Sequence, residues 1–461
     1  MSMPIANPST SSTGPTKTEN KMKLVNNYFD GLPVTKKQIF LYAIIVLAYF
    51  FEQLDNNNFS FIAPALIKSW GIQKSQIAQI TSLYFFGMTL GGISGGIISD
   101  IIGRRKTFLG AILIFSSMSV LNGFTNNLTV FMITRALTGF GIFCMMVVSV
   151  AYIAEMTPGE SRGKWQSITA AGGFCAMPVI GFIARAIIPM GPEAWRIIFY
   201  IGGIGFIGFF LGLKYLIESP RWLVAKGRVA EAEKVVEELS GVAVDLSEAA
   251  KNVSKKESVR EQFVGMFSGK YLKRTIVLLL IGIPMNIGNF TTSGWMPTLL
   301  NGNGFTLEQS LTIGTAFMLG GPVGLFLSSF VSDKGGRKIP YGIGTLCWMA
   351  LTVIFATLGN HYVTIMIVAF LLNAFAMGVG FIAMAYLPEH YPTKMRNTSV
   401  GFVNAAQRLG VSAAQLFIPV VMVSFGFRGL FMGIAGLYLF SALVVLIWGE
   451  RTGGKSLEEV V

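Results

Sequence analysis

The sequence predicts an all-α integral membrane protein with twelve transmembrane helices, arranged as two parallel-related halves of six helices each. Three observations carry this prediction: an apolar composition, twelve apolar stretches of spanning length, and an internal repeat of about 233 residues. Of the 461 residues, 52% are hydrophobic and only 13% are charged, whereas a soluble domain carries about 25% charged residues. The core of a single soluble domain cannot bury so much apolar surface.

Each transmembrane helix needs ~20 mainly apolar residues, and twelve stretches of the chain meet this requirement. The predicted spans are 39–65, 76–100, 107–124, 128–154, 164–189, 195–217, 272–300, 309–333, 340–358, 362–389, 397–425 and 427–448. The polar segment 1–38 has no apolar signal-peptide core and is predicted to be a disordered cytoplasmic tail. The predicted organisation is this tail, a six-helix half over 39–217, a linker with amphipathic helices over 218–271, a second six-helix half over 272–448, and a tail over 449–461.

The distribution of basic residues predicts the orientation, because cytoplasmic loops carry an excess of Lys and Arg. Of the 36 Lys and Arg residues, 29 lie in the tails or near loops that follow even-numbered spans, and five lie on the opposite side. Both tails are therefore predicted to be cytoplasmic, in a multi-pass protein of the bacterial plasma (inner) membrane. The net charge of +13 follows from this topology, so it does not call for a nucleic-acid partner.

The chain offers little for enzyme chemistry. The three cysteines share no ligand spacing and the two histidines fall in predicted loops, so no metal site is expected. No nucleophile, metal cluster or phosphate-binding loop accompanies the spans. We therefore expect no catalytic residue and no cofactor.

Three motifs recur at nearly one offset, each after an even-numbered span. The first set is Gly96-x-x-x-Asp100-x-x-Gly103-Arg104-Arg105-Lys106, Glu155-x-x-Pro158-x-x-x-Arg162-Gly163 and Glu218-Ser219-Pro220-Arg221. The second set is Ser329-x-x-x-Asp333-x-x-Gly336-Arg337-Lys338, Glu389-x-x-Pro392-x-x-x-Arg396 and Glu450-Arg451-Thr452. The offsets are 233, 234 and 232 residues. Since both sets follow even-numbered spans, the two halves have the same orientation in the membrane, as in major facilitator transporters.

On these motifs the chain resembles the major facilitator superfamily over all twelve spans, and the resemblance implies that fold and transport by alternating access. The segment from Gly96 to Lys106 is similar to the superfamily's signature between spans two and three, and Arg135-x-x-x-Gly139-x-Gly141 is similar to its span-four signature. Glu218-Ser-Pro-Arg-Trp-Leu223 and Gly454-Lys-Ser-Leu-Glu-Glu459 resemble the branch of sugar porters, aromatic-acid/proton symporters and organic-ion transporters. Ser329 departs from the Gly of the first motif, which suggests looser packing there.

The repeated acids and arginines are predicted to form a cytoplasmic gate. A rocking transporter needs a latch that is stable in one state, and half-buried carboxylate–guanidinium pairs offset their desolvation only in a suitable geometry. The alternative is that these residues merely anchor loops. The predicted gate comprises Asp100, Arg104, Glu155 and Arg162 in the first half, Asp333, Arg337, Glu389 and Arg396 in the second, and Glu218, Arg221 and Glu450 as an outer tier.

Glu52 and Asp55 are the acids predicted to lie near mid-membrane, and their spacing places them on one face of the first span together with Asn56. A charge there costs at least ~2.5 to 3.5 kcal/mol, so a functional role is the first hypothesis. Burial favours the protonated acid, and both are predicted proton-coupling residues; a permanent ion pair is the alternative. Glu52-x-x-Asp55 resembles the acid-x-x-acid signature of aromatic-acid/proton symporters, but its neighbours differ from the usual ones, which leaves open which acid titrates.

Arg408 is predicted ~16 Å into span eleven, close to the bilayer middle. Its planar fork suits a carboxylate, and span eleven of organic-anion transporters similarly carries an arginine, which implies a substrate-binding role. The alternative is a standing salt bridge to Glu52 or Asp55, and the two roles combine if protonating the acid frees Arg408. Arg135 is predicted about 10 Å from the outer end of span four. The sequence does not decide whether its role is structural or in proton coupling.

The other predicted substrate-binding residues are polar or aromatic side chains along the spans, the usual walls of a small-molecule site: Asn56, Asn289, Trp295, Asn404 and Gln407. We expect proton-coupled symport of a small organic anion, an aromatic or similar monocarboxylate, with the proton gradient as the driving force. The protein is expected to work as a monomer in the lipid bilayer. A sugar or polyol proton symporter is the first alternative, although the segment from Gly282 to Thr291 lacks the paired glutamines of sugar porters. A non-transporting solute receptor is the alternative of another class, although the chain has no sizeable signalling extension.

Overall fold

The computed structural model describes residues 22–23, 28–251, 259–332, 336–359, 361–392 and 395–452. Helices of the first half are α1 (Lys36–Trp70), α2 (Lys74–Ile102), α3 (Arg104–Phe124), α4 (Leu128–Met156), α5 (Gly159–Phe174), α6 (Ala176–Ile187), α7 (Trp195–Gly202) and α8 (Gly205–Tyr215), with the short 3-10 helix η1 (Ile188–Met190) after α6. The fifth and sixth predicted spans are each broken in the middle, so that α5 with α6 and α7 with α8 each make one span.

The second half contains α13 (Gly269–Gly302), α14 (Leu307–Ser328), α15 (Lys338–Thr357), α16 (Tyr362–Tyr386), η3 (Pro388–His390), α17 (Arg396–Gln415) and α18 (Ile418–Trp448). α18 consists of two helical parts that meet at a kink at Gly426, whose φ of 67° lies in the left-handed region that favours glycine. The chain reverses there, between the two last predicted spans. Span eleven is therefore α17 followed by the first part of α18.

Eleven helical segments of the described residues are long and apolar enough to cross a membrane, when α5 with α6 and α7 with α8 are each counted as one segment. α17, which forms most of the predicted span eleven, is missing from this group, because its sequence alternates apolar residues with amides, serines and an arginine. These polar residues include Gln407, Arg408 and Ser412. A helix that lines the interface between two bundles tolerates such residues, since they face protein and not lipid.

The two halves share one packing scheme, as the sequence repeat requires. α2 packs closely on α4, and α14 packs equally closely on α16. A Cβ at Gly87 or Gly91 would collide with the backbone of α4, and a Cβ at Gly320 or Gly324 would collide with the backbone of α16. These glycine pairs are separated by the same 233 residues as the loop motifs. Close approach of small residues is how transmembrane helices gain contact, so the packing confirms two parallel-related halves.

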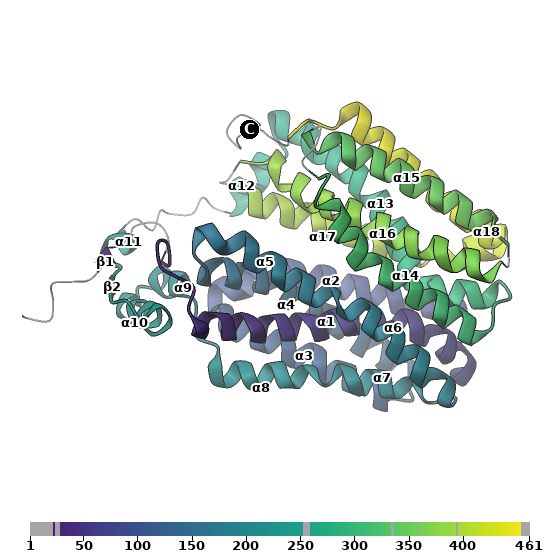
Figure 1. The fold of residues 1–461 in the computed structure, drawn as a ribbon, viewed down its shortest axis with the longest axis horizontal. Coiled ribbons are helices and arrows are strands. Elements are labelled where there is room, and N and C mark those ends of the chain that lie inside the picture. Colours follow the sequence, from purple (N-terminus) through teal and green to yellow (C-terminus); the bar gives the residue numbers. More distant parts are fainter. Residues whose placement is uncertain are drawn as a thin grey trace, which may run out of the picture.

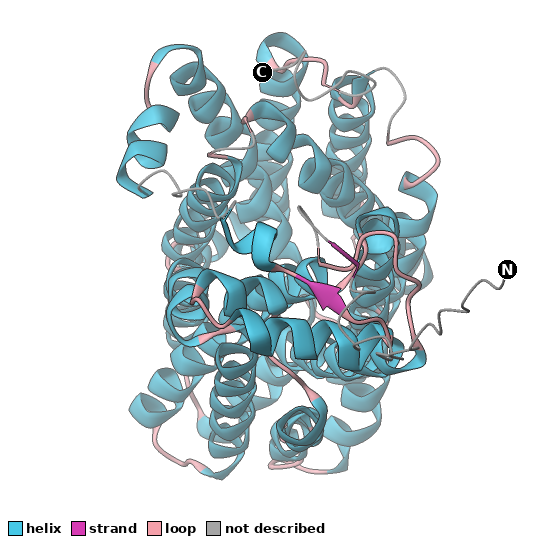
Figure 2. Cartoon of the chain, turned by 90° about the vertical axis from the view of Figure 1, so that its left-hand side faces the viewer, coloured by secondary structure: helices cyan, strands magenta, loops and turns pink. Residues whose placement is uncertain are grey.

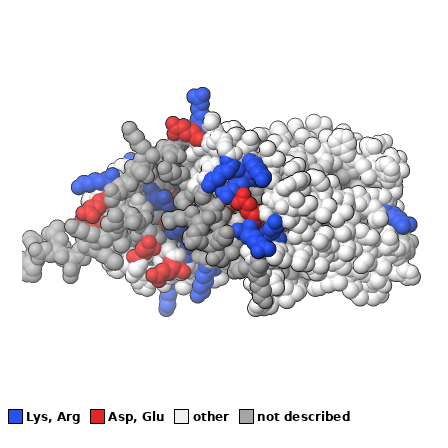
Figure 3. Space-filling view, turned by 90° about the horizontal axis from the view of Figure 1, so that it is seen from above, with Lys and Arg blue, Asp and Glu red and all other residues white. Residues whose placement is uncertain are grey.

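The linker between the halves contains α9 (Pro220–Ala225), α10 (Val229–Ser240), α11 (Ser247–Lys251) and α12 (Val259–Met266), and we call the end of the bundle where they lie the linker side. Two short strands, β1 (Met22–Lys23) and β2 (Val244–Asp245), pair in parallel there. Figure 2 looks onto this side, with the strands in front of the helix ends. On the face shown in Figure 3, charged side chains gather toward the linker side.

The expectation of a disordered tail is wrong for the part of segment 1–38 that the structure describes. Phe29 is fully buried and Leu32 nearly so, in a cluster with apolar residues of α9 and α10. Asp30 Oδ1 accepts a hydrogen bond of 2.7 Å from the backbone N–H of Gly159, at the start of α5. Thr35 caps α1 and donates to the carbonyl of Leu239 at 2.6 Å. Apolar burial and these bonds hold residues 29–35 against the bundle.

The halves meet along α1 with α13, α2 with α17, and α6 with α14. At this interface Ser412 Oγ donates to the Ser82 carbonyl at 2.8 Å, and a Cβ at Gly181 of α6 would lie only 3.0 Å from the Cα of Thr315 in α14. α14 packs along α6 but barely touches α5, which continues toward the linker side. In Figure 1 the two bundles accordingly converge away from the linker and splay toward it.

Candidate functional site

The middle of α1 carries two buried carboxylates. Glu52 is 1% exposed and Asp55 is fully buried. Asp55 Oδ1 accepts hydrogen bonds from Ser119 Oγ at 2.6 Å and from Asn58 Nδ2 at 2.7 Å. Its other oxygen, Oδ2, accepts no hydrogen bond from the residues that the structure describes and lies 3.7 Å from Nη1 of Arg135. Asp55 is thus held by α1 and α3 on one side and faces the guanidinium of α4 on the other.

Arg135 is the ionic neighbour of Asp55. Residue spacing along the sequence did not predict this pair. Its side chain is 1% exposed, and its guanidinium carbon lies 4.4 Å from the ring centre of Tyr84, 5.1 Å from that of Phe59 and 5.7 Å from that of Phe199. Aromatic faces stabilise a cation that has lost its water. Nε and Nη1 of Arg135 have no hydrogen-bond partner within the described chain.

Arg408 occupies a separate place, between the two halves. Its guanidinium carbon lies 4.4 Å from the ring centre of Phe290 in α13 and 4.9 Å from that of Phe143 in α4. Within the part of the chain that the structure describes, Nη1 is buried without a hydrogen-bond partner. Arg408 interacts electrostatically with Glu52, and Oε2 of Glu52 also has no hydrogen-bond partner among the described residues. Because Asp55 lies against Arg135, Glu52 is the acid that remains for the alternative of a standing salt bridge to Arg408.

The other predicted substrate-binding residues fall into different environments. Trp295 is 2% exposed and donates its indole N–H to Gln415 Oε1 at 2.6 Å, so it is a packed core residue with its donor already used. Gln407 Oε1 accepts a hydrogen bond of 3.1 Å from Asn286. Asn289 and Asn404 are half-buried. The structure therefore does not bring Trp295 into the group around Arg408.

A cavity of about 50 Å³ lies between the halves beside these charges. Asn56 is on its wall, where its Oδ1 accepts a hydrogen bond of 2.6 Å from the Tyr84 hydroxyl. Arg135 also lines the cavity. The sequence did not predict this position, because four helices that are distant in sequence, α1, α2, α4 and α13, enclose the cavity together. The full lining is Asn56, Asn57, Phe59, Ser60, Thr81, Tyr84, Phe85, Arg135, Phe290, Ser293 and Gly294.

The predicted gate residues of the first half form a cluster on the linker side. Arg104 makes two hydrogen bonds of 3.0 Å to the carboxylate of Glu155 and one of 2.6 Å to Asp100. Glu218 Oε1 accepts from the backbone N–H groups of Arg104, at 2.7 Å, and of its neighbour Arg105, at 3.1 Å, at the start of α3. A carboxylate at a helix N-terminus satisfies its unpaired donors.

Two predicted members stand apart from that cluster. Arg162 has a buried Nε without a hydrogen-bond partner among the described residues, and Arg221 is exposed. Neither bonds to the carboxylate of Glu155, whose partners are Arg104 and Ser219. The repeat predicted these arginines from sequence position, but their side chains do not converge in this conformation.

The second half repeats the central pair. Arg337 lies 2.9 Å from Glu389, and this pair is related to that of Arg104 and Glu155 by the internal repeat. Arg396 donates to the carbonyl of Tyr391 at 3.2 Å, while Asp333 lies outside the described residues. The ion pairs described on the linker side thus join helices within one half.

Glu450 has an ionic partner that the sequence did not identify. Arg274, at the start of α13, donates to both carboxylate oxygens of Glu450, at 3.1 and 2.8 Å. Arg274 has no counterpart in the repeated motifs, so no sequence signal connected it to the gate. The pair fastens the end of α18 to the first turns of α13.

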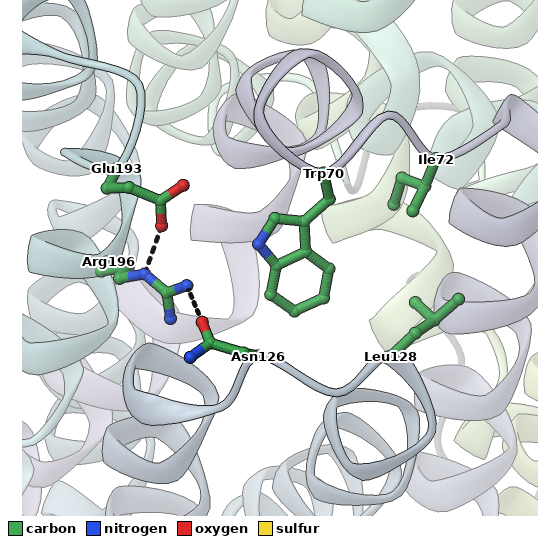
Figure 4. A pocket seen from close by; sticks show the side chains of 6 residues that line it. All are labelled: Trp70, Ile72, Asn126, Leu128, Glu193 and Arg196. Atoms are coloured by element: carbon green, nitrogen blue, oxygen red, sulfur yellow. Dashed lines mark hydrogen bonds and ion pairs between the residues drawn. The ribbon is translucent and has the colours of Figure 1, made fainter.

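A second pocket, of about 470 Å³, opens on the end of the first half remote from the linker (Figure 4). Arg196 lies on the wall of this pocket and donates to Glu193 Oε2 at 2.5 Å and to Asn126 Oδ1 at 2.5 Å (Figure 4). It also donates to the carbonyls of Gly123 and Thr125, each at 2.8 Å. Its donors are used within the protein, so this arginine ties loops together.

Comparison with known proteins agrees with this architecture. The family model described as "Sugar (and other) transporter" matches residues 32–461. The chain is 32% identical to a putative metabolite transport protein, YyaJ, of Bacillus subtilis, over 94% of this chain and 96% of that one. It is 28% identical to the niacin transporter NiaP of Acinetobacter baylyi, over 95% of this chain and all of that one.

Among solved structures, the fold is similar to the inward open conformation of the xylose transporter XylE from E. coli. The TM-score is 0.74 with 20% sequence identity, over 92% of this chain and 98% of that one. At this identity the likeness concerns the fold. The chain belongs to the sugar (and other) transporter family of the major facilitator superfamily, and it is a membrane transporter and not an enzyme.

Proposed function

We propose that this transporter is a proton-coupled symporter of a small organic anion, with an aromatic monocarboxylate as its substrate. The observation that carries the proposal is the set of charges buried in the middle of the bundle. Glu52 and Asp55 are balanced by Arg135 and Arg408, and the Arg408 guanidinium keeps an unpartnered donor at the interface of the halves. An always-charged donor in such a place attracts an anion.

Charge balance supplies the coupling. With all four side chains ionised the set is neutral, and an entering carboxylate adds one negative charge to a region where each uncompensated charge costs at least ~2.5 to 3.5 kcal/mol. One proton on Glu52 restores neutrality and releases Arg408 for the substrate. Asp55, which already holds two hydrogen bonds and faces Arg135, serves as the second acid and keeps the first half assembled.

The surroundings of Arg408 favour an aromatic acid. Phe143 and Phe290 lie on its guanidinium from opposite halves of the protein, so a substrate carboxylate on this group is surrounded by rings. Aromatic walls with a few polar contacts suit a planar, largely apolar solute. Niacin, the solute named for one relative, is a pyridine carboxylic acid.

Alternating access follows from how the halves meet. They pack together away from the linker and splay toward it, and the linker side carries most of the basic residues, so we assign it to the cytoplasm of a bacterial plasma membrane. This assignment makes the conformation inward-facing. The pairs of Arg104 with Glu155 and of Arg337 with Glu389 keep each half rigid while the halves rock.

A sugar or polyol is the competing substrate class, because the family model covers sugar transporters. The test uses purified protein in proteoliposomes with an alkaline interior and labelled benzoate, nicotinate and xylose. We expect benzoate or nicotinate to accumulate, with the pH gradient required, and xylose to remain at equilibrium. Accumulation of xylose without either acid would refute the proposal.

A further inference from the structure

Span six is broken beside Asp55, and the proposed function does not use this break. Gly203 and Ile204 separate its two parts, α7 and α8. The backbone N–H groups of these two residues donate to carbonyls three residues back, at 3.0 and 2.9 Å. In a regular α-helix Gly203 would donate to the carbonyl of Phe199, four residues back. A short stretch of such tight turns inside a helix often marks a functional hinge.

The carbonyl of Phe199 lies against Ser119 of α3. Ser119 is fully buried, and its Oγ is within hydrogen-bonding distance of two acceptors, the Phe199 carbonyl at 3.2 Å and Asp55 Oδ1 at 2.6 Å. Gly202 allows this close approach, because a Cβ there would lie 2.3 Å from Ser119 Oγ and 2.8 Å from Asp55 Oδ1. A serine hydroxyl carries one hydrogen, so Ser119 serves one of these acceptors at a time.

The protonation state of Asp55 decides which acceptor that hydrogen serves. An ionised Asp55 only accepts hydrogen bonds, and Ser119 lies closer to its Oδ1 than to the carbonyl. The other oxygen, Oδ2, faces the cation of Arg135 at 3.7 Å, so a proton taken up by Asp55 goes to Oδ1. The new O–H group then donates to Ser119 Oγ, and the Ser119 hydrogen turns to the Phe199 carbonyl. No covalent bond of the serine breaks in this exchange.

We propose that Ser119 is a positioning residue that transmits the protonation state of Asp55 to the break in span six. With a proton on Asp55, Ser119 satisfies the buried carbonyl and stabilises the broken span. Without that proton the carbonyl loses its donor, which favours a regular helix in which Gly203 donates to it. Ionisable side chains on three helices also face Asp55: Glu52 on α1, Tyr84 on α2 and Arg135 on α4.

This inference rests on the proposed function, in which Asp55 is the second acid beside Glu52. Two acids one helical turn apart titrate as a pair, so Asp55 carries a share of the coupling proton. The inference adds the step by which that proton moves a helix.

The test uses Ser119→Ala, with Ser116→Ala as the matched control. Ser116 is one turn away on α3, equally buried, and faces the same break, since a Cβ at Gly205 would lie 2.5 Å from its Oγ. That Oγ has no hydrogen-bond partner among the described residues. In proteoliposomes with an alkaline interior, Ser119→Ala should lower accumulation of labelled benzoate or nicotinate about fivefold or more, while counterflow exchange continues. Ser116→Ala should keep both, and Ser119→Thr, which retains the hydroxyl, should restore accumulation.

A second measurement needs no substrate. With the three native cysteines replaced by alanine, spin labels at Leu213 and Val150 report the position of α8 relative to α4; both side chains are exposed. A change in kink of about 20° moves Leu213 by ~4 Å. We therefore expect the label distance to change between about pH 5 and pH 8 when Ser119 is present, also in Ser116→Ala, and to stay constant in Ser119→Ala.

The outcomes separate the two proposals. Accumulation of neither acid by the protein with native Ser119 overturns the proposed function, and the label distance still tests the switch. A label distance that does not respond to pH in that protein overturns the switch and leaves carboxylate transport standing. A pH response or an accumulation that Ser119→Ala leaves unchanged also overturns it. Parallel loss of accumulation and counterflow in Ser119→Ala does the same, because the serine would then be only structural.

Discussion

Replacement of Arg408 tests the proposed function most directly. Its guanidinium lies between the rings of Phe143 and Phe290 and keeps a buried Nη1 unpartnered, so it is available to a substrate carboxylate. Removing one partner of a buried charged pair costs ~3 to 5 kcal/mol, which corresponds to a loss of roughly two to four decades in affinity. Arg408→Ala should therefore abolish measurable binding of benzoate or nicotinate. Arg408→Lys should bind weakly, since lysine keeps the charge but loses the planar fork.

The assay is equilibrium binding of labelled benzoate and nicotinate to purified protein, with Arg196→Ala as a matched control. Arg196 is equally an arginine held between helices, but its donors are occupied by Glu193, Asn126 and backbone carbonyls. Its loss should lower thermal stability and leave carboxylate affinity near native. Near-native affinity in Arg408→Ala would refute the reasoning. So would recovery of binding in Arg408→Ala combined with Glu52→Gln, because Arg408 would then serve only as a counter-ion.

Four further predictions concern the other charges. Asp55→Asn leaves the buried Arg135 without its carboxylate and should lower the free energy of unfolding by ~3 to 5 kcal/mol, seen as a lower Tm in detergent. Adding Arg135→Gln to Asp55→Asn should recover most of this stability. An equal loss of stability in the single and the double variant would contradict the pairing. Glu52→Gln should abolish stimulation of uptake by an imposed pH gradient while counterflow exchange continues, whereas uphill accumulation in this variant would exclude Glu52 as the proton carrier. Glu155→Gln weakens the bonds of Arg104 inside the first half and should lower the free energy of unfolding by about 1 to 3 kcal/mol, seen as a lower Tm in detergent. Asp100→Asn should lower it by less than ~1 kcal/mol, because the Asp100 side chain is 53% exposed and that of Glu155 only 9%. An equal effect of the two would count against this ranking.

The gate illustrates how far the repeat could predict the site. It related Arg104 with Glu155 to Arg337 with Glu389, and the structure contains both pairs at about 3 Å. Shared sequence spacing predicts this much because both copies fold on the same helix framework. The repeat could not predict that Arg274 joins Glu450, since that contact depends on how α13 lies against the end of α18.

The sequence by itself determined the membrane-spanning class, the two parallel halves, and the presence of carboxylates and guanidinium groups at spanning depth, because hydropathy and helical spacing are local properties. Only the tertiary structure decided that Asp55 faces Arg135, that Arg408 lies between Phe143 and Phe290, and that Trp295 is sealed into the core. The physical reason is that the partner of a buried charge is fixed by the rotation and depth of neighbouring helices. Those are set by close backbone contacts, such as that of α2 on α4, which couple residues far apart in the chain.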